Sequence, residues 1–156
     1  MSFRITGLSA EPFQHLFGKS DSELADKGVQ RYTVDSCPNF PDRIEMQDVA
    51  VGETVLLLNH TCQPADSPYH ASHAIYVREG AAQTFDEIDT VPEVMSSRLL
   101  SLRGFDDKGM MQEGDVADGE DAIRQIIKEF FANPDVDYIH AHNAKRGCYS
   151  GRIDRV

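Results

Sequence analysis

Side chains that can bind ligands or transfer protons are concentrated near the end of the chain. The segment YIHAHN spans residues 138–143 and the segment CYSGRID spans residues 148–154. In an extended strand every second side chain points to the same face. The alternation therefore predicts one polar face on each segment, made of Tyr138, His140 and His142 in the first and of Cys148, Ser150 and Arg152 in the second.

The two segments are short enough, and close enough, to form a hairpin that turns across residues 143–147. We expect His142 to lie opposite Cys148, His140 opposite Ser150 and Tyr138 opposite Arg152. This register sorts every polar side chain onto one face and leaves the other face apolar for the core. A slip of one residue would undo the sorting.

Two imidazoles at positions i and i+2 of a strand are a spacing used to bind zinc and other borderline metals. On this hypothesis His140 and His142 provide two ligands, and His73 or a carboxylate provides the third. His60 and Cys62 share a face at the end of another predicted strand and are weaker candidates for the same site. The alternative is that His140 and His142 belong to a partly solvated sheet face.

A second hypothesis makes Cys148 a thiol nucleophile with His142 as its base, because a nearby imidazole favours the reactive thiolate. The alternative is that Cys148 is a small packed residue.

A third hypothesis is a small-anion site, in which Arg152 offers a bidentate fork and Lys145 and Arg146 add charge. Lys145 and Arg146 are equally compatible with a solvated basic turn.

The secondary-structure elements that must position these residues are predicted to be a mixture of strands and helices. Apolar residues at positions 123, 126, 127, 130 and 131 predict a long amphipathic helix over 119–132, with Asp118 as its N-cap. Ser20 and Glu23 form a capping box at the start of one of two short N-terminal helices. Strands outnumber helices and follow one another directly, which favours a single α+β domain with a mainly antiparallel sheet.

Composition excludes several classes of partner. The 156 residues carry 15 Lys and Arg against 26 Asp and Glu, for a formal net charge of -11. This acid excess disfavours nucleic acid and anionic membrane surfaces, both of which attract basic proteins. We expect a cytoplasmic protein, because no export signal or membrane span is visible and the 3 cysteines include no CxxC pair. Of residues 1–80, 81–137 and 138–156, only the last part has more basic than acidic side chains.

Three segments in this order resemble a bacterial family of uncharacterised proteins, domain-of-unknown-function family 1203: SPYHASHAIYVREG, LLSLRGFDDKGMM and YIHAHNAKRGCYSGRIDR. The resemblance covers essentially the whole chain and implies a single-domain bacterial protein, without an activity or a cofactor. The chain departs from the family pattern at His70, at Arg146 and over residues 59–62. These departures argue against a site built on His60, Cys62 or His70. Other candidates lie on matched positions: His73, Asn143, Lys145, Cys148 and Arg152.

The sequence therefore predicts a small-molecule or small-anion site, enzymatic or not, on the polar face of the hairpin, with His73 or Arg103 nearby. No cofactor follows from the residues. The predicted ligand-binding residues are His73, Tyr138, His140, Asn143, Lys145, Ser150 and Arg152, and the catalytic candidates are His142 and Cys148. The alternative is a non-catalytic interaction module that forms a homodimer through a sheet edge or through the apolar loop around Phe40.

Overall fold

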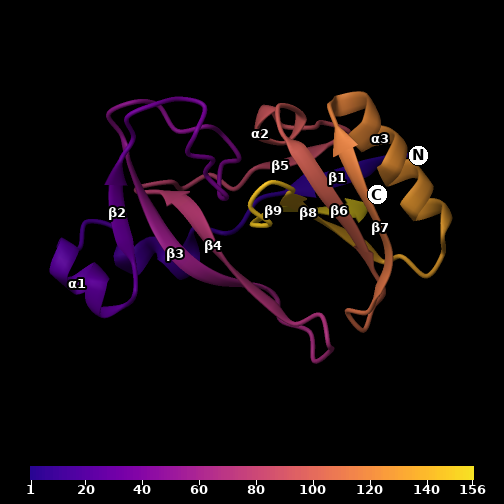
Figure 1. The fold of residues 1–156 in the computed structure, drawn as a ribbon, viewed down its shortest axis with the longest axis horizontal. Coiled ribbons are helices and arrows are strands. Elements are labelled where there is room, and N and C mark those ends of the chain that lie inside the picture. Colours follow the sequence, from indigo (N-terminus) through magenta and orange to yellow (C-terminus); the bar gives the residue numbers. More distant parts are fainter.

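The computed structural model describes residues 1–156 and contains two antiparallel sheets (Figure 1). The larger sheet has six strands in the order β5-β1-β9-β8-β6-β7. Its strands are β1 (Phe3–Thr6), β5 (Asp86–Ile88), β6 (Leu99–Phe105), β7 (Met111–Asp118), β8 (Tyr138–Asn143) and β9 (Tyr149–Arg155). The smaller sheet has the order β2-β3-β4 and consists of β2 (Gln30–Thr33), β3 (Thr54–Gln63) and β4 (Ala71–Arg78).

Helices are few and mostly short. They are the 3-10 helix η1 (Glu11–Leu16) and the α-helices α1 (Asp21–Asp26), α2 (Glu93–Ser96) and α3 (Glu120–Ala132). The fold is thus of the α+β type with mainly antiparallel sheets, as predicted. No helix has the length and apolar character needed to cross a membrane.

One face of the larger sheet carries the main hydrophobic core, with α2 and α3 packed over it (Figure 1). The inward stripe of α3 meets apolar residues from all the central strands. The fully buried residues of this core include Ile123 and Ile127 of α3 and, from the strands, Leu100, Leu102, Ile139 and Ile153. With alternation along β8, this packing sends Tyr138, His140 and His142 to the opposite face of the sheet.

A second hydrophobic core covers one face of the smaller sheet and connects this sheet to the larger one. Leu56 and Leu58 of β3 and Ile75 and Val77 of β4 pack together with η1, α1 and Tyr149 of β9. Because Tyr149 belongs to the larger sheet, the polar face of β8 and β9 is turned toward the smaller sheet. The site therefore lies where two sheets meet.

The predicted hairpin exists, but its predicted register is wrong. His140 pairs with Arg152 and not with Ser150, Tyr138 pairs with Asp154 and not with Arg152, and His142 pairs with Tyr149 and not with Cys148. A register shift between Ala141 and His142 leaves Ser150 as an extra residue. Such a bulge reverses the side-chain alternation on one strand only, which a pattern of strict alternation cannot anticipate.

The start of α3 also differs from the prediction. Asp118 is the last residue of β7, and the N-cap is Gly119, which makes no side-chain cap and has φ 87°. A positive φ at this position suits glycine, because other residues rarely adopt it. At α1, by contrast, the predicted capping box between Ser20 and Glu23 is present in full.

Candidate functional site

Aromatic and imidazole rings line the contact between the two sheets. The rings of His73 on β4 and His142 on β8 have centroids 5.0 Å apart, and His60 on β3 lies 6.2 Å from Tyr149 on β9. The amide Nε2 of Gln63 donates to the hydroxyl of Tyr138 over 2.9 Å. Residues far apart in the sequence are thus brought into one polar layer.

Three side chains in this layer have the composition of a metal site. One potential ligand atom from each of Cys62, His73 and His142 lies within 4.8 Å of the other two. Cys62 is the extra residue of a bulge between Thr61 and Gln63 on β3. The bulge allows the side chains of two successive buried residues, Cys62 and Gln63, to lie on the same face of the smaller sheet.

The hydrogen bonds of the two histidines leave ligand atoms free. His142 Nδ1 lies 2.9 Å from the carbonyl oxygen of Gly147, so it donates a proton there and Nε2 keeps its lone pair. His73 Nε2 is buried and has no hydrogen-bond partner. A backbone carbonyl is one of the acceptors by which proteins usually orient a metal-binding histidine.

Burial keeps both imidazoles neutral at physiological pH. Desolvation lowers the pKa of His142 to about 4, and it lowers that of His73 together with the positive charge of Arg103. Burial also raises the pKa of the Cys62 thiol. The thiol must therefore lose its proton when a metal binds, whereas the histidines are already in the ligand form.

His140 lies outside this group of three ligands. It belongs to a cross-strand row in which Arg103 of β6, His140 of β8 and Arg152 of β9 are direct neighbours. The residue is only 3% exposed, its Nδ1 has no partner, and burial lowers its pKa to about 3. Arg152 lies over the ring of Tyr138 at 4.1 Å and pairs with Asp154 at 2.8 Å.

Cys148 faces a different set of partners from the one predicted. Arg43 Nη2 is 3.2 Å from its sulfur and Asn143 Nδ2 is 3.6 Å away, and no hydrogen bond joins it to His142. Arg43 is 3% exposed and also donates to the carbonyl oxygens of Tyr149 and Pro41. The structure therefore does not show the predicted pairing of Cys148 with His142 as nucleophile and base.

The remaining predicted residues divide into two groups. Ser150 is buried in the bulge of β9, and the Oδ1 atom of Asn143 is buried without a partner. Lys145 and Arg146 are exposed on the turn between β8 and β9. Phe40, expected on an apolar loop, is half-buried and packs against Tyr76 with ring centroids 5.1 Å apart.

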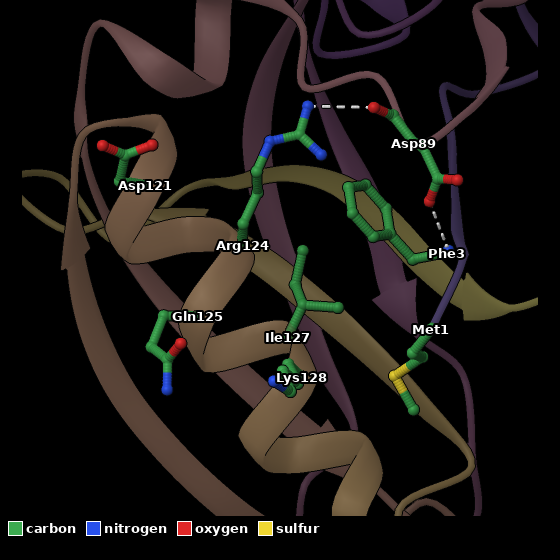
Figure 2. Close-up of a pocket in the computed structure, with 8 residues that line it drawn as sticks. All are labelled: Met1, Phe3, Asp89, Asp121, Arg124, Gln125, Ile127 and Lys128. Atoms are coloured by element: carbon green, nitrogen blue, oxygen red, sulfur yellow. Dashed lines mark hydrogen bonds between the residues drawn. The ribbon is translucent and has the colours of Figure 1, made fainter.

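A cavity of about 520 Å³ lies elsewhere, between the N-terminus and α3 (Figure 2). Phe3 and Arg124 flank it, and both donate hydrogen bonds to Asp89, one to the side chain and one to the backbone carbonyl. It contains no histidine or cysteine. The potential ligand atoms and the cavity thus occupy different parts of the fold.

Sequence reasoning gave little weight to Cys62 and overlooked Arg43, Gln63 and Tyr149 as site residues. The even spacing of His60 and Cys62 was the available signal for Cys62, since it placed a thiol on a face with a histidine. No such signal exists for Arg43, which lies in an irregular segment. Its role depends on a contact with a residue 105 positions later.

Comparison with curated proteins and with solved structures gives no match. The sequence itself matches the model of a protein family over residues 39–155. This range includes strands β3, β4, β8 and β9 and all of the residues in the polar layer. The protein therefore belongs to the family described as Protein of unknown function (DUF1203).

Proposed function

We propose that this protein binds a zinc-type metal ion through Cys62, His73 and His142, and that the metal forms part of a small-molecule site on the polar face of β8 and β9. The observation that carries the proposal is the convergence of one sulfur and two imidazole ligand atoms within 4.8 Å. The three residues come from three strands in two sheets. Proximity of this kind between distant strands requires the tertiary fold.

The chemistry of the three donors favours zinc. A thiolate and two neutral imidazoles are the ligands of borderline divalent ions, whereas calcium and magnesium prefer oxygen. A set of one cysteine and two histidines leaves a fourth tetrahedral position for water or a ligand. This is the arrangement of catalytic zinc sites, while structural sites use four protein ligands. The proposal therefore includes a site that is open to a small molecule.

The orphaned polar atoms support the same interpretation. A buried nitrogen without a partner costs free energy, about 1–3 kcal/mol, so His73 Nε2 needs a partner that the protein does not provide. A metal ion at the point shared with Cys62 and His142 satisfies it. The bond from His142 to the Gly147 carbonyl fixes the ring in the orientation that presents Nε2.

Metal analysis tests this proposal. The protein is stripped with a chelator, reconstituted with zinc, and measured by elemental analysis and by competition with a chromophoric chelator. We expect about one equivalent of zinc in the wild type. The variants His73→Ala and His142→Ala should bind more than about a hundredfold more weakly, beyond the 10–100-fold loss typical of an outer-sphere partner. Cobalt substitution should give a thiolate charge-transfer band that Cys62→Ser removes.

Matched controls exist in the same chain. His70 and Cys37 are exposed and lie outside the group of three ligands, so His70→Ala and Cys37→Ser repeat the chemical changes without touching the site. Both should bind zinc like the wild type. Absence of stoichiometric binding in the wild type, or full binding by His73→Ala, contradicts the proposal.

A further inference from the structure

The row formed by Arg103, His140 and Arg152 crosses three neighbouring strands on the face that also carries His142. Residues directly opposite each other in an antiparallel pair have Cβ atoms about 4.5–5.5 Å apart. Two arginines therefore flank one histidine across the three strands. The Nδ1 atom of His140 has no hydrogen-bond partner, although the residue is only 3% exposed.

The charges in this row do not cancel. Arg152 is paired with Asp154, which neutralises it in part. Arg103 has no carboxylate partner, and its guanidinium makes one long hydrogen bond, from Nε to Ser101 Oγ at 3.3 Å. The row keeps about one net positive charge in a protein whose formal net charge is -11, so an anion is the ligand that it fits.

The side of Arg103 away from His140 is open. Its neighbour on β7 is Gly114, which is exposed and has no side chain to cover the guanidinium. A Cβ at Gly114 would meet only the sulfur of Met111, at 3.8 Å. A ligand can therefore approach Arg103 along the β7 edge of the sheet.

We infer that Arg103 and His140, helped by Arg152, bind the oxyanion of a small molecule that carries a carboxylate or a phosphate. Arg103 provides the uncompensated charge and a planar fork of donors, and His140 provides a hydrogen-bonding group without a protein partner. The inference rests on the proposed metal function for the idea that one small molecule occupies both places. The charge and the unpaired donors of the row are independent of it.

Titration with two simple oxyanions tests the inference. Inorganic phosphate and acetate are titrated into the metal-free protein at constant ionic strength, with calorimetry and amide NMR shifts as readouts. Acetate is then titrated into the zinc-loaded protein. We expect saturable binding of at least one of the two oxyanions to the metal-free protein, with NMR shifts at residues 101–105 and 138–142. The ratio of the two affinities tells carboxylate from phosphate recognition.

The variants separate Arg103 from the other basic residues. Arg103→Gln should weaken oxyanion binding about tenfold or more, since a charge-assisted hydrogen bond is lost. Arg103→Lys should retain part of the affinity, because it keeps the charge without the fork. Arg146→Gln removes the same charge from an exposed turn residue that has no ion pair and should leave the affinity within about twofold of the wild type.

Each contrary outcome has a distinct meaning. No saturable binding to the metal-free protein, or equal losses in Arg103→Gln and Arg146→Gln, overturns the oxyanion site. If anion binding requires zinc and Arg103→Gln does not change the affinity, the anion binds to the metal alone, and the oxyanion site is again overturned. Phosphate or acetate binding that persists in a wild type unable to hold zinc supports the oxyanion site and leaves only the metal proposal refuted.

Discussion

Glu79, directly after β4, joins three parts of the smaller sheet through one carboxylate. It accepts hydrogen bonds from Arg31 on β2 at 2.8 and 2.9 Å and from the hydroxyl of Thr54 on β3 at 2.8 Å. The backbone amide of Gly18 adds a fourth donor at 2.8 Å. The Glu79 side chain is 14% exposed and that of Arg31 is 20% exposed. Glu79→Gln removes the charge and keeps the shape.

The size of the effect follows from the pKa of this carboxyl. The Arg31 guanidinium, together with the Gly18 amide and the Thr54 hydroxyl, lowers the pKa of Glu79 from 4.5 to about 2. One pKa unit corresponds to about 1.4 kcal/mol, so the carboxylate stabilises the fold by about 3 kcal/mol. The same interaction raises the pKa of Arg31, and it is counted once. Glu79→Gln should therefore lower the free energy of unfolding by about 3 kcal/mol at pH 7.

The sign of the pH dependence is fixed by the direction of the shift. A carboxyl whose pKa is lower in the folded state stabilises the fold fully above its unfolded value, here 4.5. The contribution is lost as the pH falls from 4.5 toward 2. Urea denaturation at pH 7, 5, 4 and 3 should show the difference between wild type and variant shrinking by about 1.4 kcal/mol per pH unit below pH 4.5.

Asp86 provides the control, because its pair with Arg4 is exposed on both sides. Asp86→Asn should change the stability little at any of these pH values. The reasoning is refuted if Glu79→Gln matches the wild type at pH 7. It is also refuted if the difference between the two proteins stays constant down to pH 3, because the loss would then reflect shape and not charge.

Three further substitutions test the packing around the sheets. Gly7→Ala places a methyl group against the carbonyl oxygen of Ile44, with that of Arg43 at 2.9 Å, so it should destabilise the fold strongly in thermal denaturation. Gly114→Ala, which meets only Met111, should have little effect, and equal Tm losses in the two variants would contradict this argument. Ile139→Ala removes a fully buried side chain from the core under α3 and should cost about 2–5 kcal/mol in urea denaturation. A cost below about 1 kcal/mol would show that this core is loosely packed.

Local patterns in the sequence predict much of this fold, because the signals for helices and strands act over a few residues. The apolar spacing at positions 123–131 corresponds to the buried stripe of α3, and the Ser20 capping box is present as written. The short edge strand β5 carries no such pattern, since all three of its residues are exposed. It exists because β1 offers an unpaired edge, which is a property of the assembled sheet.

The candidate site is only partly predictable, for a related reason. Alternation correctly places His140 and His142 on one face of β8, opposite the core residues Ile139 and Ala141. It does not reveal that His142 lies beside Cys62 and His73, because that contact depends on how the two sheets are packed. The family pattern argued against Cys62, although this residue provides the only thiol near both histidines.

Breaks in the strand ladders explain how Gln63 joins Cys62 in the polar layer. Cys62 is the extra residue of one bulge, and Ser150 is the extra residue of the other, next to the pair formed by His142 and Tyr149. A bulge bends its strand and turns a side chain to the face opposite to the one that strict alternation predicts. Without the first bulge, Cys62 and Gln63 would point to opposite faces of the smaller sheet. Both irregularities occur where the two sheets meet, so the distortions that change the register also change which side chains enter the polar layer.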